Sequence, residues 1–169
     1  MFRIMAQTKD PGIYNAPPID ACVLSVSPHE EDHCSLERIL RQPGCALKPE
    51  WTLIASPTLA SATRVLRERA IPAVVCECEL FPGTWREMLE RIQLLPEPPL
   101  LIVTSRLADE RLWAEALNLG AYDVLAKPFD ATEVTRVIGS ALRRWQAGHI
   151  ARRLLRQAEV ETMYSSSAQ

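Results

Sequence analysis

The chain has 169 residues, 47% of them hydrophobic and 24% charged, and its 19 basic and 21 acidic residues give a formal net charge of -2. This size and composition predict one globular domain with short extensions. The balanced charge argues against binding of nucleic acid by bulk electrostatics. No run approaches the roughly 18 consecutive apolar residues that a membrane span needs, which argues against an integral membrane protein.

The cysteines and the two chain ends carry further expectations. Five cysteines are an odd number in a chain rich in aliphatic residues, which disfavours a disulfide-stapled secreted scaffold and predicts a reduced, cytoplasmic location. Residues 1–20 lack the apolar stretch of a signal peptide and are predicted to form a flexible leader. Residues 147–169 are predicted to form a tail that is first helical and then, at its Ser-rich end, disordered.

Short apolar runs alternate with helical patterns along the rest of the chain. The apolar runs predict five strands, over residues 22–26, 51–55, 73–77, 100–104 and 122–126. Helical spacing predicts one helix after each strand, and Asp130 is predicted to cap the last one. The predicted buried stripes of the five helices are Leu36, Ile39 and Leu40; Ala62, Val65 and Leu66; Trp85, Met88, Leu89 and Ile92; Leu112, Ala116 and Leu119; and Val134, Val137, Ile138, Ala141, Leu142 and Trp145.

Strict alternation of strands and helices predicts an α/β fold with a parallel sheet. We expect a doubly wound, flavodoxin-like, five-stranded sheet of order 2-1-3-4-5 over residues 21–146, with helices on both faces. In such a sheet a functional site lies at the carboxyl ends of the strands.

Two segments in the second half of the domain carry a resemblance to a known family. Residues 100–105 read LLIVTS, and residues 118–129 read NLGAYDVLAKPF. Together they resemble the fourth strand and the following "G-A-x-D-x-L-x-K-P-F" segment of the receiver domain of bacterial response regulators. The resemblance covers approximately residues 22–145. It implies a protein of two-component signal transduction, in which a histidine kinase transfers a phosphoryl group to an aspartate at the end of the third strand.

The residues that carry this chemistry in the family are replaced here. The family holds Mg²⁺ with an acidic pair after the first strand, and the aligned residues are Ser27 and Pro28, which offer no carboxylate. The phosphoacceptor position falls on Glu77 or Cys78, and we favour Glu77 because Phe81 resembles an extra residue in the following loop. The neighbouring acidic residues on the first helical turn are expected to point elsewhere. These are Glu30, Glu31 and Asp32.

Other family positions are retained. Thr104 and Lys127 match the switch hydroxyl and the lysine, and the resemblance implies a cis peptide bond between Lys127 and Pro128. The family's switch aromatic is absent at Val124, unless Tyr122 substitutes for it. Two interpretations of Glu77 stay open: its carboxylate imitates part of the charge of a phosphorylated aspartate, or it pairs with Lys127.

The sequence therefore predicts a stand-alone, degenerate receiver domain that is not an enzyme and needs no cofactor, with Mg²⁺ binding not expected. It would bind a protein partner, a histidine kinase or an output protein, without aspartyl phosphorylation. The expected partner face comprises the fourth helix, fifth strand and fifth helix, with Trp113, Tyr122 and Trp145. Dimerisation through this face or through the Arg-rich tail is left open.

Three weaker patterns supply alternatives. His29 to His33 reads HEEDH and matches the H-E-x-x-H zinc motif, but a partly buried packing role for His33 is favoured over a metal-dependent enzyme that uses His29 and His33. A phosphoacceptor that uses displaced carboxylates is kept as a further alternative. Cys76 and Cys78 would face the same side of a strand, where buried cysteine usually acts as a small hydrophobe. A basic cluster suits a solvated helix face better than a nucleic-acid regulator. It comprises Arg143, Arg144, Arg152, Arg153 and Arg156.

Overall fold

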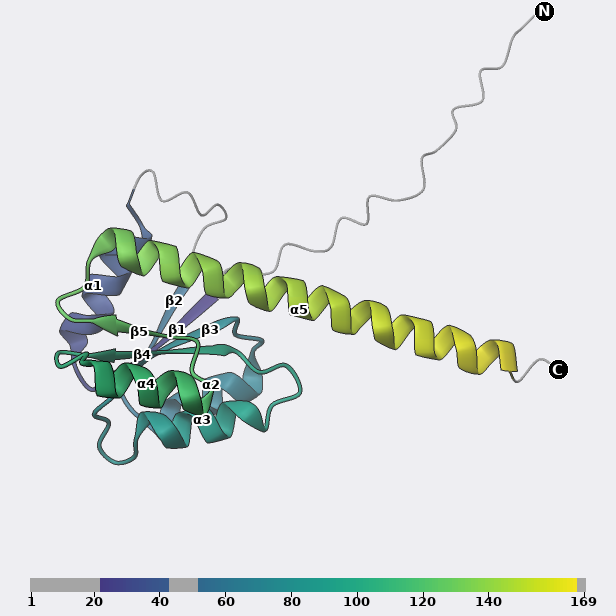
Figure 1. Cartoon of the computed structure of the whole chain (residues 1–169), viewed down its shortest axis with the longest axis horizontal. Helices are drawn as coiled ribbons and strands as arrows, with labels where there is room; N and C mark the ends of the chain where they lie inside the picture. The colour runs from purple at the N-terminus through teal and green to yellow at the C-terminus, as the bar shows by residue number, and fades with distance from the viewer. Residues whose placement is uncertain (1–21, 43–51, 167–169) are drawn as a thin grey trace, which may run out of the picture.

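The structure is a computed structural model that describes residues 22–42 and 52–166, with side chains up to residue 159. The predicted leader over residues 1–20, the predicted strand residue Trp51 and the last three residues of the tail lie outside this part of the chain. The described residues form five strands and five helices in alternation (Figure 1). The strands are β1 (Cys22–Val26), β2 (Thr52–Ser56), β3 (Ala73–Glu77), β4 (Leu100–Ser105) and β5 (Asp123–Ala126). The helices are α1 (Glu30–Leu40), α2 (Leu59–Glu68), α3 (Trp85–Gln93), α4 (Glu110–Leu119) and α5 (Ala131–Ser166).

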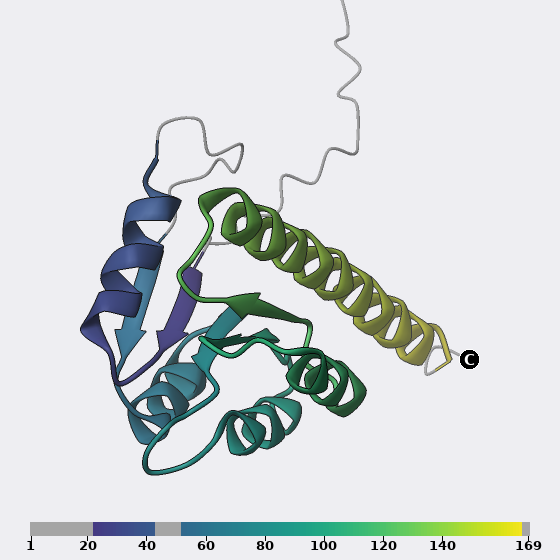
Figure 2. The same ribbon diagram turned by 60° about the vertical axis from the view of Figure 1, so that its left-hand side comes forward.

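All neighbouring strands run parallel, in the order β2-β1-β3-β4-β5, which confirms the predicted doubly wound, flavodoxin-like fold. Helices α1 and α5 cover one face of the sheet, and α2, α3 and α4 cover the other (Figure 2). Alternate residues of each central strand enter opposite cores, because successive side chains of a strand point to opposite faces. Val23 packs on the α1/α5 side, for example, and Leu24 on the α2–α4 side, both fully buried.

Local sequence signals set where the helices begin. Thr58 and Thr84 each form a capping box, in which the hydroxyl accepts a bond from the backbone N–H of the third residue of α2 or α3, and the backbone N–H of the threonine donates to the side chain of that residue. Asp109 caps α4 in the simpler way. The predicted cap Asp130 is confirmed, because its carboxylate accepts a bond of 2.8 Å from the backbone N–H of Glu133.

Two details of α4 and α5 differ from expectation or extend it. Leu119 was predicted to lie on the buried stripe of α4 but is 47% exposed, because it is the last helical residue before the left-handed Gly120. Helix α5 continues without interruption to Ser166, over 36 residues, so that its second half extends past the body of the domain (Figure 1). None of the described helices combines the length and the apolarity that crossing a bilayer requires.

Candidate functional site

Polar side chains gather where the strands end on the α1/α5 side of the sheet. Val23, Val75, Ile102 and Leu125 line that side along β1, β3, β4 and β5. Two residues further on, and also four residues further on in the first strand, the same side carries polar residues toward the carboxyl edge. These residues are Ser25 and Ser27, Glu77, Thr104 and Lys127.

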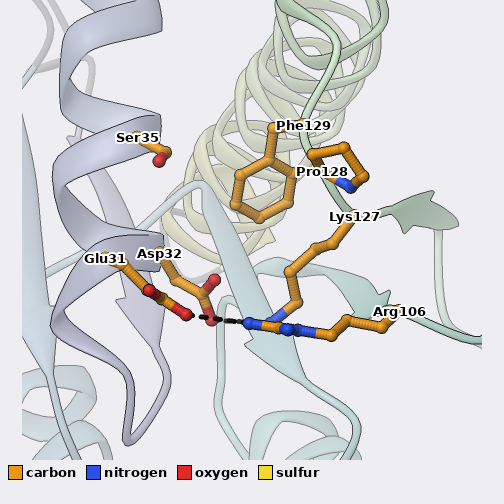
Figure 3. A pocket seen from close by; sticks show the side chains of 7 residues that line it. All are labelled: Glu31, Asp32, Ser35, Arg106, Lys127, Pro128 and Phe129. Atoms are coloured by element: carbon orange, nitrogen blue, oxygen red, sulfur yellow. Dashed lines mark hydrogen bonds and ion pairs between the residues drawn. The ribbon is translucent and has the colours of Figure 1, made fainter.

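An ammonium group held by two carboxylates is the centre of this cluster. Nζ of Lys127 donates to Oδ2 of Asp32 at 2.6 Å and also forms an ion pair with Oε2 of Glu77. The three side chains are only 6 to 8% exposed. Figure 3 shows the Asp32 side chain, from the first turn of α1, pointing toward the Lys127 side chain, which comes from the loop before α5.

Asp32 corrects the expectation that the acidic residues of the first turn point elsewhere. Its carboxylate faces the sheet because it lies four residues before the buried Leu36, on the same side of α1. Glu30 is exposed as expected, and the exposed Glu31 pairs with Arg106 at 2.8 Å. The spacing between Asp32 and Leu36 was the sequence signal that could have identified this residue.

Hydrogen bonds from β1 and α1 fix the Asp32 carboxylate. The buried hydroxyl of Ser27 donates to Oδ2 of Asp32 at 2.6 Å. The neighbouring ring of His33 lies 2.8 Å from the Ser25 hydroxyl through Nδ1 and 3.0 Å from the Ser27 carbonyl through Nε2. Since a carbonyl only accepts, Nε2 carries a hydrogen, and Ser25 donates to Nδ1 when the ring is neutral.

Glu77 is tied to the same region from β3. In the sheet it lies directly beside Thr104, whose hydroxyl donates to Oε2 of Glu77 at 3.5 Å. The backbone N–H of Glu79 approaches Oε1 at 3.4 Å. The pairing of Glu77 with Lys127, one of the two interpretations left open by the sequence, is present, and the same oxygen contacts both Lys127 and Thr104.

The environment of Lys127 favours its charged form. Burial alone would lower the pKa of the ammonium, but hydrogen bonds and charge from Asp32 and Glu77 outweigh burial and raise this pKa above its ordinary value. Two carboxylates around one ammonium leave the three side chains with one negative charge in excess when all are ionised. The N-terminal turn of α1 partly offsets that charge, because the helix dipole is positive at this end.

The two cysteines that flank Glu77 are poorly disposed to react as thiolates. Cys76 is fully buried in the α2–α4 core, and burial is the main cause that raises its pKa far above the ordinary value. Cys78 lies half-buried, and burial followed by the nearby carboxylates also raises its pKa, against a lowering hydrogen bond with Ser105. Both groups are thus protonated thiols at neutral pH, as expected for cysteines that pack as small hydrophobes.

The position of a family-type Mg²⁺ site can be compared with these residues. Ser27 is buried with its hydroxyl directed to Asp32, and Pro28 is exposed. Oδ2 of Asp32 already accepts bonds from both Ser27 and Lys127. Ser27 and Pro28 thus offer no carboxylate, and Oδ2 of Asp32 is already engaged, whereas a divalent cation requires several free oxygen ligands. The implied cis bond between Lys127 and Pro128 is confirmed.

A shallow cleft of about 350 Å³ opens over the Lys127 side chain. Its walls come from the first turns of α1, the loop after β4 and the loop before α5. Figure 3 shows the residues that line it. They are Glu31, Asp32, Ser35, Arg106, Lys127, Pro128 and Phe129.

The two histidines of the H-E-x-x-H match do not assemble as a pair of ligands. His29 is exposed, whereas His33 is buried and directs both ring nitrogens to Ser25 and Ser27. Within the described residues, no group of three or more His, Cys, Asp or Glu side chains is arranged to hold a metal ion. The interpretation of His33 as a buried packing histidine is the one that agrees with these contacts.

The predicted partner face changes in one respect. Trp145 is 4% exposed, because it lies on the buried side of α5, where its ring stacks on His149 with centroids 5.0 Å apart. It therefore contributes to the core, as its stripe predicted, and its expected role as accessible apolar surface is wrong. Trp113 and Tyr122 are half-buried and pack against the two cores from opposite sides of the sheet.

Comparison with known sequences gives a local match. No protein-family model matches the chain. A stretch of 59 residues is 42% identical to the transcriptional regulatory protein FixJ of Bradyrhizobium diazoefficiens. The stretch covers 34% of this chain and 28% of FixJ, so that the match spans less than a third of that relative.

Comparison with solved structures covers most of the chain. The signal receiver domain of an HD domain-containing protein from Pseudomonas fluorescens Pf-5 superposes with a TM-score of 0.67 at 24% identity, over 78% of this chain and 93% of that one. The signal receiver domain of a putative Luxo repressor protein from Vibrio parahaemolyticus gives 0.69 at 15%, over 78% and 97%. A response regulator receiver domain protein from Clostridium thermocellum gives 0.64 at 18%, over 75% and 98%. The described domain thus has the fold of response-regulator receiver domains.

Proposed function

We propose that this chain is a receiver-type module of two-component signalling that acts by binding a protein partner and is held in one state without aspartyl phosphorylation. One observation carries the proposal: the Glu77 carboxylate contacts both Lys127 and Thr104. In the family that the sequence resembles, a Lys and a Thr at these positions contact the phosphoryl group. A permanent carboxylate therefore stands in for part of the phosphoryl charge.

The surroundings of Glu77 support the absence of phosphoryl transfer. A carboxylate nucleophile needs an available oxygen and a cation that screens the incoming phosphate. The Oε2 oxygen is engaged by Lys127, and the ammonium is shared with Asp32. In this proposal the lysine takes the part of the divalent cation, so that the site requires no Mg²⁺ and catalyses no reaction.

The partner is proposed to be a histidine kinase or an output protein of the cytoplasm. Exposed apolar side chains support a docking role for the carboxyl edge of the sheet, because the loops after β3 and β4 present Phe81 at 91% and Leu107 at 80% exposure. Aromatic side chains such as that of Phe81 are enriched in protein interfaces relative to the rest of the surface.

Incubation with acetyl phosphate and Mg²⁺ tests the proposal. Intact-mass measurement is expected to show no added phosphoryl group, while a receiver domain with a complete acidic site, treated in parallel, gains one. A phosphoryl adduct that maps to Glu77 or Asp32 by peptide analysis would contradict the proposal.

A second experiment tests whether Glu77 sets the state of the domain. The substitution Glu77→Gln removes the charge that Lys127 and Thr104 contact, so amide hydrogen exchange in β4 and β5 should accelerate. Glu79→Gln is the matched control, because Glu79 is exposed and lies two residues further along the chain. Equal exchange rates in the two variants would argue against a charge that holds the state.

A further inference from the structure

A groove opens at the amino edge of the sheet, beside the C-terminal ends of α2 and α3. It consists of two adjoining hollows of about 290 and 310 Å³, and Leu66, Arg67 and Leu95 line both of them. Ile71 and Pro99, which precede β3 and β4, line the first hollow and place the groove at the edge opposite to the candidate functional site. We call this surface the α2–α3 groove.

The floor of the groove is apolar. Leu66 and Ile71 are buried members of the core between the sheet and α2–α4, and Leu95 packs against that core. Leu94, the residue that follows α3, lines the second hollow and is 85% exposed. The hollows lie at the lower end of the range for binding pockets, about 300–1,000 Å³, so each suits one apolar side chain better than a large cofactor.

Three exposed arginines surround this apolar floor. Arg67 and Arg69 come from the last turn of α2 and the residue after it, and Arg91 comes from the last turn of α3. Arg91 donates to the hydroxyl of Thr63 at 2.9 Å, which is an uncharged partner. Among the residues that the structure describes, no carboxylate forms an ion pair with any of the three guanidinium groups. Each therefore has N–H donors available to an incoming acceptor.

The carboxylates of the groove do not cancel this charge. Glu97 lines the first hollow, but it already pairs with His149 at 3.1 Å and with Arg156 at 2.9 Å, both on α5. Glu68 is exposed and is the one other carboxylate among the described lining residues. Three arginines against Glu68 leave two positive charges in excess. The C-terminal dipoles of α2 and α3, each equivalent to about half a negative charge, stabilise this cluster without neutralising it.

The composition of the groove indicates a polypeptide ligand. Single-stranded nucleic acids bind with their bases stacked on aromatic side chains, and within the described chain no aromatic residue lines either hollow. A small anion such as phosphate would make no use of the apolar floor or of Leu94. A peptide with acidic and apolar residues uses both features, since an apolar side chain enters a hollow while carboxylates accept paired bonds from the arginines.

We propose that the α2–α3 groove is a docking surface for an acidic segment of a partner protein. An apolar side chain of that segment packs against Leu66 and Leu95, and its carboxylates accept bonds from Arg67, Arg69 and Arg91. The groove is separate from the candidate functional site, so this role does not depend on whether that site accepts a phosphoryl group. Because the contact area is small and the charges are exposed, the binding is expected to be weak and sensitive to salt.

Selection from a random library of displayed decapeptides tests the class of ligand. The full chain serves as bait, and peptides that bind the double variant Arg67→Glu/Arg91→Glu are removed beforehand. The remaining peptides should be enriched in aspartate and glutamate and should carry at least one large apolar residue. No enrichment, or enrichment of peptides with net positive charge, would overturn the proposal. Enrichment from a random oligonucleotide library in place of the peptides would assign the arginines to nucleic acid.

Mapping of amide chemical shifts with the best enriched peptide locates the site. The shifts of residues 66–71 and 91–97 should change and saturate as peptide is added. Arg67→Glu should raise the dissociation constant about tenfold or more, because it sets like charges against one another. Arg111→Glu is the matched control, since Arg111 is an exposed arginine on α4 and its reversal changes the net charge equally. This control should change the dissociation constant by less than about twofold.

The substitution Leu94→Ser tests the apolar contact. It should raise the dissociation constant about fivefold through the loss of buried apolar area. Leu117→Ser is the matched control, because Leu117 is an exposed leucine, 46% accessible, on α4. Circular dichroism of all variants verifies that they remain folded. Equal weakening by a variant and its control would overturn the proposal. So would shifts confined to the loops after β3 and β4, which would place the peptide at the carboxyl edge, or groove shifts that depend on protein concentration without peptide, which would assign the groove to a second copy of this chain.

Discussion

Lys127 contacts two carboxylates but carries a single positive charge. This imbalance of charge makes it the most consequential single residue of the described domain. Asp32 and Glu77 come from different elements, the start of α1 and the end of β3, and meet only through the ammonium. A buried pair that loses one member leaves an uncompensated charge, which costs more than the intact pair contributes. The consequence is that the lysine and the two carboxylates have unequal effects when each is replaced.

The substitution Lys127→Met should lower the free energy of unfolding by about 3–5 kcal/mol at neutral pH, because it leaves both carboxylates buried and unpaired. Urea denaturation followed by tryptophan fluorescence measures this change. Arg111→Met is the control for removal of a positive charge from an exposed position and should stay within about 0.5 kcal/mol of the wild type. Adding Glu77→Gln to Lys127→Met should recover part of the loss, and a strictly additive further loss would contradict the shared-ammonium arrangement.

The raised pKa of Lys127 predicts a loss of stability in alkaline solution. Because the folded pKa lies above the ordinary value of 10.5, the stabilisation is complete below that pH and is lost as pH rises through the folded pKa. The difference in unfolding free energy between the wild type and Lys127→Met should therefore be constant from neutral pH to about 10 and shrink at higher pH. A difference that stays unchanged as pH rises above about 10 would contradict this sign.

At the scale of the elements, two glycines on helices illustrate how position decides the effect of a residue. Gly120 ends α4 with φ of 107°, a left-handed conformation that side chains with a Cβ rarely adopt. Gly148 lies inside α5, where an added Cβ would meet only the end of the Arg152 side chain, at 3.7 Å. The first position requires glycine, and the second does not.

The substitution Gly120→Ala should therefore destabilise the domain by about 1–2 kcal/mol, the cost of a left-handed alanine. Gly148→Ala should instead raise the helicity of α5 and its stability by about 0.5–1 kcal/mol. Thermal unfolding and far-ultraviolet circular dichroism compare the two variants directly. Equal effects of the same sign would contradict the assignment of Gly120 as the residue that ends α4.

The sequence was sufficient for the elements because proline, glycine and capping residues separate apolar runs with clear periods. It was less informative for the site, which depends on contacts between elements far apart in the chain. Glu77 and Lys127 could be paired from the family resemblance. Asp32 was missed because its direction depends on how α1 leaves β1. Trp145 was predicted both in the buried stripe of α5 and on the accessible partner face, and these roles are incompatible. The spacing of apolar residues along a helix does not show at which residue the rest of the domain stops covering that helix.

At the scale of the whole molecule, α5 joins two regions that lie at opposite edges of the sheet. It begins beside the carboxyl edge, where Lys127 lies, and passes the amino edge, where Glu97 contacts it before β4 (Figure 1). Residues that share no partner and lie far apart contribute independently to stability. The cluster around Lys127 and the second half of α5 should therefore behave as separate units.

A combined variant tests this independence. The changes in unfolding free energy caused by Lys127→Met and by Gly148→Ala should add within about 0.5 kcal/mol in the double variant. Urea denaturation of the four proteins at one protein concentration gives the coupling energy. A coupling above about 1 kcal/mol would show that α5 transmits the state of one edge to the other.

The composition of the basic residues gives the Lys127 cluster a practical chemical property. Lys127 is the only lysine among the described residues. Within them it therefore carries the only side-chain primary amine, because the other basic side chains of the Lys and Arg type are arginines. Acylating reagents attack amines and spare guanidinium groups, and they require the neutral, accessible form. The rate at which the Lys127 peptide becomes acylated therefore reports how often Asp32 and Glu77 release their shared partner, and it does so without any probe having to be introduced.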